Sequence, residues 1–275
     1  MVNNPLQKYF RQPKVFVKLP SGGIYSKPGT IQGDVTHMPV YGMTGMDEII
    51  NKTPDALLSG ESTAAIISSC CPNIKDPWEL SIIDLTMLLA AIRVATYGNI
   101  MAVTHVCTNC KTENDYDLDL NRVIEHYMNC NYDNKIVLND LTITLVPMNY
   151  RQSTEFNLKN FRLQQQVAQA EVVEDETERQ ALVSKLFKDL ARVQNEIYKV
   201  TIESVNTGTQ VVTERAFILE WIDNADRSVF EAIKELNTKN NDTWTMPKFP
   251  VKCDTCGTET NITVELDQAN FFVRA

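Results

Sequence analysis

Two short cysteine motifs constrain this chain more than any other feature of its sequence. They are Cys107-Thr-Asn-Cys110 and Cys253-Asp-Thr-Cys256, and the residues after each motif, 111–120 and 257–266, are near-copies in which threonine, glutamate and leucine recur at the same offsets. A gap of two residues lets both thiolates of one tight turn bind the same ion, and zinc takes four such ligands in a tetrahedron. The sequence therefore predicts that Cys107, Cys110, Cys253 and Cys256 form one zinc site, to which each motif contributes half.

The residues around each motif favour a structural zinc site over a redox dithiol or a disulfide. A redox Cys-x-x-Cys begins a helix, whose dipole lowers the pKa of the first thiol. Here runs typical of β-strands, residues 101–106 and 249–252, precede the motifs, which predicts β-hairpins with the cysteines at their tips. Four cysteines leave no coordination position for a substrate, so the zinc is expected to stabilise the fold and not to catalyse. His105 is either a spare metal ligand or an ordinary strand residue.

Composition is typical of a globular protein in a reducing compartment. The 275 residues are 43% hydrophobic and 22% charged, which suits one elaborated domain or two closely interlocked ones. No apolar run is long enough to span a bilayer, and residues 1–10 lack the apolar segment of a signal peptide, so we expect no membrane association. Seven cysteines without an export signal are typical of the cytoplasm, where thiols stay free or bind metal.

Motifs for catalysis are absent from the sequence. It contains no phosphate-binding P-loop, no dinucleotide-binding glycine motif and no His-Glu-x-x-His motif, and its three histidines are scattered. We therefore expect no catalytic residue, no cofactor other than zinc, and no enzymatic activity.

Charge is distributed unevenly along the chain. The net charge is −9, yet residues 1–40 carry five basic residues and one acid. Because neutralised phosphates supply most of the affinity for nucleic acid, the acidic remainder argues against nucleic acid as the main partner. Residues 1–43 predict a basic strand/loop arm that docks on an acidic protein face. The alternatives are a solvated tail and a segment that orders against the chain's own core.

The segments together predict an α+β fold with a mainly helical core, short β-hairpins, a split zinc-ribbon-like site of four cysteines and a long helical hairpin. Residues 44–149 are expected to form the helical core with the first zinc knuckle and a β-hairpin. Residues 206–275 are expected to return as helices to the second knuckle, interlocked with that core. Between them, residues 150–205 contain no glycine or proline and predict a helical hairpin that turns at the acids of 174–176. Its apolar seam has a near-heptad spacing and is either the packing face between the helices or part of an arm that grips another subunit. The seam consists of Leu182, Leu186, Leu190, Val193, Ile197 and Val200.

One helix is expected at the centre of the core. Residues 82–98 are apolar nearly all round the predicted helix and end at a glycine. Ser81 and Asp84 have the spacing of a capping box at its start. Arg93 is the charge in its interior, and its side chain either reaches the surface along its aliphatic stem or pairs with an acid or a partner.

A series of short sequence motifs in the first third of the chain resembles, in content and order, the motifs of a known family. The motifs are Asn4-Pro5-Leu6, Tyr9-Phe10-Arg11, Lys18-Leu19-Pro20-Ser21, Pro39-Val40-Tyr41-Gly42-Met43-Thr44, Asp47-Glu48, Thr53-Pro54-Asp55-Ala56-Leu57, Asp76-Pro77-Trp78 and Ala91-Ile92-Arg93-Val94-Ala95-Thr96-Tyr97-Gly98. Over residues 1–120, which include the first cysteine motif, the chain resembles the baseplate hub and hub-assembly proteins of T4-type contractile-tailed phages.

The resemblance implies a structural or assembly protein of the virion without enzymatic activity. Such a protein is made in the host cytoplasm and acts at the tail baseplate, with other baseplate and tail hub proteins as partners. Self-association in a symmetric assembly is a further expectation. The contrasting hypothesis is a zinc-ribbon factor that binds nucleic acid or acts in transcription, which the cysteine motifs favour and the acidic charge opposes. A zinc hydrolase would need an open metal position, which four cysteines do not leave.

Overall fold

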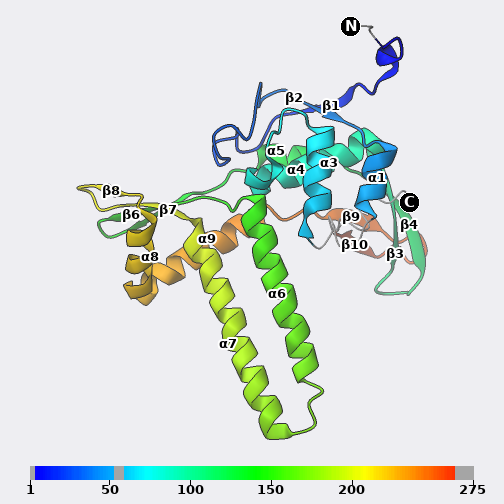
Figure 1. Ribbon diagram of the computed structural model, residues 1–275. Coiled ribbons are helices and arrows are strands. Elements are labelled where there is room, and N and C mark those ends of the chain that lie inside the picture. The colour runs from blue at the N-terminus through cyan, green and yellow to red at the C-terminus, as the bar shows by residue number, and fades with distance from the viewer. Residues whose placement is uncertain (1–3, 53–58, 264–275) are drawn as a thin grey trace. The chain divides into compact units, whose positions relative to one another are not determined.

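The computed structural model describes residues 4–52 and 59–263 and has an α+β fold, with helices and short antiparallel sheets (Figure 1). The chain divides into two compact units, one comprising Met1–Asn131 with Trp244–Ala275 and the other Tyr132–Thr243. The outer ends of the predicted segments 1–43 and 206–275, namely residues 1–3 and 264–275, lie outside the described residues. In the described part of the chain, no helix is long and apolar enough to cross a membrane.

The first unit is built from helices and three two-stranded antiparallel sheets, which pair β1 with β2, β3 with β4, and β9 with β10. Its elements are η1 (Gln7–Tyr9), β1 (Pro13–Val17), β2 (Met38–Tyr41), α1 (Gly45–Asn51), α3 (Glu61–Cys70), η2 (Pro77–Glu79), α4 (Ile82–Tyr97), β3 (Ile100–Val106), β4 (Glu113–Asp119), α5 (Asn121–Asn129), β9 (Phe249–Lys252) and β10 (Glu259–Ile262).

Helix α4 lies at the centre of the first unit, as its sequence predicts. It buries residues on every side and contacts α3, α5, β1 and β2. Gly98 ends the helix with a φ of 91°, a left-handed conformation that glycine adopts without strain. Arg93 does not reach the surface, because its side chain is buried and its guanidinium lies 4.5 Å from the centre of the Tyr97 ring. Burial lowers the pKa of this guanidinium.

The predicted capping box at the start of α4 is wrong. Ser81 occupies the N-cap position but makes no side-chain capping hydrogen bond. The Asp84 carboxylate instead accepts hydrogen bonds from the Ser21 amide, at 2.9 Å, and from the Ser21 hydroxyl. Desolvation of the fully buried Asp84 raises its pKa to about 6, against the opposing effect of the Ser21 bonds. Spacing along one helix could not reveal this contact with a distant turn.

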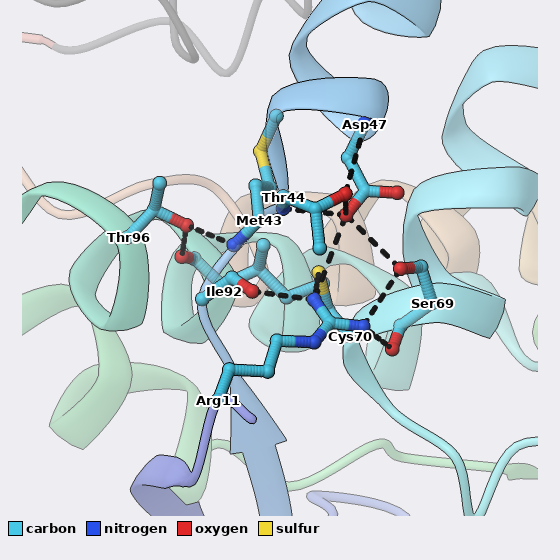
Figure 2. A network of polar contacts seen from close by, with 9 residues as sticks. Arg11, Met43, Thr44, Asp47, Ser69, Cys70, Ile92 and Thr96 are labelled. Carbon is cyan, nitrogen blue, oxygen red and sulfur yellow. Dashed lines mark hydrogen bonds and ion pairs between the residues drawn. The ribbon is translucent and has the colours of Figure 1, made fainter. Parts of the chain in front are cut away.

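A polar cluster fixes the N-terminal segment to α1 and α3 (Figure 2). The Arg11 guanidinium donates to the carbonyl oxygens of Gly42 and Ser69, each at 2.6 Å, and lies 3.5 Å from the buried Asp47 carboxylate. The same Asp47 oxygen accepts from the Thr44 amide at 2.7 Å and from the Ser69 hydroxyl at 3.0 Å. Arg11 is therefore a structural residue and not a free cation of a solvated tail.

The strands that follow Arg11 also belong to the fold. Val17, Leu19, Met38 and Val40 are buried on or beside β1 and β2. Gly42 approaches α4 so closely that an added Cβ atom would lie 2.8 Å from the Ala95 carbonyl oxygen. Residues 11–42 are therefore ordered against the chain's own core, whereas residues 4–10 remain exposed.

The second unit combines a four-stranded antiparallel sheet, in the order β5-β6-β7-β8, with four helices among its described residues. Its elements are β5 (Lys135–Leu138), β6 (Leu141–Leu145), α6 (Tyr150–Ala170), α7 (Glu176–Thr201), β7 (Ile202–Asn206), β8 (Val211–Val212), α8 (Arg215–Asn224) and α9 (Arg227–Thr243). One face of the sheet packs on α8 and α9 through a cluster of apolar residues: Ile136, Ile143, Leu145, Ile202, Val205, Ile218, Ile222, Ile233 and Leu236.

Helices α6 and α7 form the predicted helical hairpin and lie side by side (Figure 1). Asn149 and Gln152 make a capping box at the start of α6, and Asp175 caps α7 by accepting from the Glu178 amide at 2.8 Å. Leu186 and Val193, both on the predicted seam, are the buried apolar residues of α7. The helical part ends at Thr201, and residues 202–206, partly expected in the hairpin, form β7.

Candidate metal centre

The two cysteine motifs lie at the tips of two β-hairpins, as predicted. β3 and β4 pair from Ile100↔Asp119 to Val106↔Glu113, and β9 and β10 pair up to Lys252↔Glu259. Both turns have the same hydrogen bonds: the Cys107 amide donates to Thr112 and the Cys253 amide to Thr258, each at 2.9 Å. The near-copies in the sequence therefore fold into near-copies in space.

The backbone after the second cysteine of each motif is left-handed. Lys111 has a φ of 62° and Gly257 a φ of 72°. Their amides donate to the carbonyl oxygens of Cys107 and Cys253, at 3.0 and 2.9 Å. This turn directs both thiols of each hairpin to the same side, but only Gly257 adopts the conformation without a steric cost.

The structure brings the four predicted ligand atoms together. The sulfurs of Cys107, Cys110, Cys253 and Cys256 all lie within 4.8 Å of one another. Across the two hairpins, the Cys107 and Cys256 sulfurs are 3.7 Å apart, and those of Cys110 and Cys253 are 3.6 Å apart. A tetrahedron with zinc–sulfur bonds of about 2.3 Å has edges of about 3.8 Å, whereas a disulfide bond measures about 2.05 Å. All seven cysteines are free, so the spacing fits a shared metal ion and not a disulfide.

Polar residues surround the sulfurs. The buried Asn114 side chain donates to the Cys253 sulfur at 3.5 Å and accepts from the Asp254 amide at 3.1 Å. The hydroxyls of Thr112 and Thr258 lie 3.4 and 3.2 Å from the sulfurs of Cys110 and Cys256. The Asn109 amide group donates to the Thr258 hydroxyl at 3.2 Å and so connects the hairpins. Such contacts orient ligands and stabilise thiolate charge.

The hydrogen bonds favour the thiolate form on the second hairpin. The hydroxyl and amide of Thr258 lower the pKa of Cys256 to about 5, and the Cys256 amide, first among several groups, lowers the pKa of Cys253. Backbone amides of Cys110 and Asn109 act in the same direction on Cys107, but desolvation and the neighbouring sulfurs of Cys256 and Cys110 raise its pKa, and the net shift is upward. Four neighbouring sulfurs cannot all carry negative charge without a cation between them.

The sequence predicted the four cysteines that lie together, but not the polar residues that surround them. The recurring threonines were visible in the near-copies, but no pattern pointed to Asn114, whose partner sulfur lies in the other hairpin. His105 lies in β3 opposite Asn114, and within the described residues the gathered ligand atoms are the four sulfurs alone. Four cysteines around one ion complete its coordination, so the arrangement suits a structural metal.

Comparison with known proteins identifies the family of this chain. A family model described as T4 bacteriophage base plate protein matches residues 13–273. The chain belongs to this family. The resemblance of residues 1–120 to T4-type baseplate proteins is confirmed, and the match includes both cysteine hairpins. No curated protein and no solved structure matches the chain. A T4-type base plate protein has a structural role in the phage tail, where its partners are other tail proteins.

Proposed function

We propose that this base plate protein works in the hub region of the baseplate, as a hub component or as a factor in hub assembly, and that it is not an enzyme. The observation that carries the proposal is the agreement between a family match over residues 13–273 and a cysteine cluster that joins residues near 107 to residues near 256. A protein that must keep its shape while neighbours assemble on it benefits from such a cross-link.

Zinc is the ion that we assign to Cys107, Cys110, Cys253 and Cys256. The sulfur spacing, the Cys-x-x-Cys turns and the absence of an open ligand position in a four-thiolate site support a structural zinc. The metal would hold the β3–β4 and β9–β10 hairpins together, since neither hairpin supplies more than two ligands. Purified protein is expected to contain about one zinc per chain.

Two segments are assigned to contacts, and the core of the first unit is assigned to the scaffold. Residues 1–43 carry an arm at their start, and residues 150–205 form a second arm, on which Phe161, Val172 and Phe187 are exposed. The helical core of the first unit, together with its two cysteine hairpins, is the scaffold that carries the knuckles. Exposed apolar side chains on a helical hairpin suit packing against another baseplate protein.

Co-purification tests the proposed role. A tagged copy expressed during infection is expected to bring down other tail components from the host cytoplasm, where we place assembly. Deletion of the hairpin tip, Glu171 to Glu178, should reduce this yield while the zinc content stays unchanged and the zinc-bound core stays folded. Failure to recover any tail component from infected cells would contradict the hub role.

The zinc-ribbon alternative makes a different prediction. A factor that binds nucleic acid would be retained on DNA or heparin resin at moderate salt, because phosphate contacts supply its affinity. With a net charge of −9, we expect this protein to flow through. Retention that depends on zinc would favour the alternative function over the baseplate role.

A further inference from the structure

The N-terminal segment presents an apolar and basic surface that is anchored at its base. Leu6, Tyr9 and Phe10 are exposed, with Tyr9 73% exposed, and η1 holds them in one short turn. Arg11, the next residue, is fixed by the polar cluster of Figure 2. Lys8 lies 4.9 Å from the centre of the Tyr9 ring. We call residues 4–10 the N-terminal hook.

The hook and the strand that follows it carry only positive charge. Residues 4–18 contain four basic residues and no acid. Lys8 is the cation within the hook, and Arg11 after it is engaged with Asp47. Lys14 in β1 and Lys18 directly after β1 are also exposed. A surface that fits this segment needs apolar hollows for the side chains and carboxylates beside them.

The second unit contains such a surface, which we call the α8 groove. It consists of a hollow of about 820 Å³ between α8 and the β5–β6 turn, and a neighbouring hollow of about 390 Å³. Leu141, Phe217 and Trp221 line both hollows. Phe217 is 62% exposed, although aromatic side chains of this size contribute most when they are covered. The groove therefore offers two adjacent hollows beside α8, a smaller one with a mostly apolar lining and a larger one with a mixed polar and apolar lining.

The charge of the α8 groove is opposite to that of the hook. Glu220 and Asp226 line the larger hollow, and among the described residues no lysine or arginine lines either one. Arg227, the neighbouring cation, donates to Glu231 at 2.7 Å on its own helix. Complementary charges at the rim of an apolar contact speed association and exclude wrong partners.

We propose that the N-terminal hook of one copy of this protein binds in the α8 groove of a second copy. Tyr9 and Phe10 enter the two hollows, and Lys8 pairs with Glu220. The hook and the groove are different surfaces, so the contact is heterologous and passes from copy to copy, which produces a closed ring or a filament. The inference goes beyond the proposed hub role and does not rest on it.

Charge reversal with mixing tests the contact. Lys8→Glu places two acids together in its own homotypic contact, and Glu220→Lys places two lysines together, so each variant alone should self-associate at least about tenfold more weakly in sedimentation experiments. In an equimolar mixture, every contact between unlike copies is attractive again. The acidic hook of the Lys8→Glu variant meets the basic groove of the Glu220→Lys variant, and the unchanged hook of the second variant meets the unchanged groove of the first. Association of the mixture should therefore return to the wild-type level.

Matched controls separate this contact from general effects of charge. Lys185→Glu and Glu178→Lys, both on the exposed surface of α7, should leave association unchanged alone and mixed. The double variant Tyr9→Ser/Phe10→Ser should abolish association while the melting temperature stays at the wild-type value, because these side chains are exposed. Wild-type protein that stays monomeric at every concentration, or a mixture that fails to recover, would overturn the proposal. A hook that binds its own groove would also overturn it, and would show as a monomer whose salt sensitivity resides in its melting temperature.

Discussion

Two sites in the first unit join segments that are far apart in the sequence, and they do so by different physical means. The cysteine cluster connects the β3–β4 and β9–β10 hairpins through four identical side chains. The polar cluster connects Arg11 to α1 and α3 through separate hydrogen bonds around Asp47. In the first site the energy would come from the proposed shared ion, so the site should be lost as a whole. In the polar cluster the energy is spread over several bonds, so the loss of one bond should weaken the cluster only in part.

The largest expected effect is the loss of the cysteine cluster. Cys253→Ser removes one of four ligands, and a structural zinc contributes on the order of 10 kcal/mol to folding. We expect the variant to lose its zinc and to unfold far below the wild-type melting temperature, and a strong chelator should do the same to the wild type. Metal analysis and thermal unfolding measure both.

A cysteine outside the cluster provides the control for that substitution. Cys130 lies at the end of α5, and burial raises the pKa of its thiol. Cys130→Ser should keep about one zinc per chain and change stability only slightly. If Cys253→Ser kept its zinc, or if chelation left the melting temperature unchanged, the cluster would not be a shared site.

Loss of Asp47 should cost less and should leave the metal in place. Asp47→Ala leaves Arg11 without its carboxylate and removes the capping box of α1, so we expect a loss of about 4 kcal/mol in the free energy of unfolding. About 3 kcal/mol of this comes from the broken ion pair, at the low end of the usual range because the Arg11 side chain is 33% exposed. Urea unfolding measures the loss, with the exposed Glu61→Ala on α3 as the matched control. Loss of zinc in Asp47→Ala would show that the two sites are not independent.

The comparison also explains what could be predicted from the sequence. The cysteine cluster could be predicted because the same local spacing occurs in both motifs. Tetrahedral zinc needs four ligands, which implied that the two motifs lie together. The same holds for α4 and the α6–α7 hairpin, whose apolar periods are local signals. The strand Phe249–Lys252 was predicted to the residue.

The polar contacts could not be predicted because their partners are distant in the sequence. Asp84 has the spacing of a capping residue, but the chain brings Ser21 to it and the local bond is not made. Asn114 gives no signal of its contact with Cys253. The basic residues of the N-terminal segment suggested a free arm, and only the fold shows that Arg11 is already bound to Asp47. Charge and spacing show which interactions a side chain can make, whereas the packing of the fold determines which of them it makes.

The pH dependence of stability tests the burial of Asp84. The pKa of Asp84 is about 6 in the folded protein, above the ordinary value of 3.8, so the protonated form stabilises the fold. Its contribution is complete below about pH 4 and is lost as the pH rises through 6. Between pH 5 and pH 7.5 we expect a loss of about 1.4 kcal/mol from this group. Asp84→Asn should remove that loss, so its stability relative to wild type should rise over this range in urea titrations with zinc present. A difference between variant and wild type that stays constant with pH would contradict the raised pKa.

The smallest expected effect tests whether the two cysteine turns are equivalent. Gly257 and Lys111 occupy matching positions with φ values of 72° and 62°, and a side chain in this region costs about 1 kcal/mol. A Cβ atom on Gly257 would meet only the end of the Lys252 side chain, at 3.5 Å, so steric crowding adds little to the backbone cost. Gly257→Ala should therefore lower the free energy of unfolding by about 1 kcal/mol, and Lys111→Gly should raise it by a smaller amount because glycine also gains entropy in the unfolded chain. Both variants should keep their zinc, since the sulfurs are untouched. Opposite signs in urea unfolding would establish that the hairpins have the same turn and differ in its cost, and a stabilising Gly257→Ala would show that the left-handed backbone is not required.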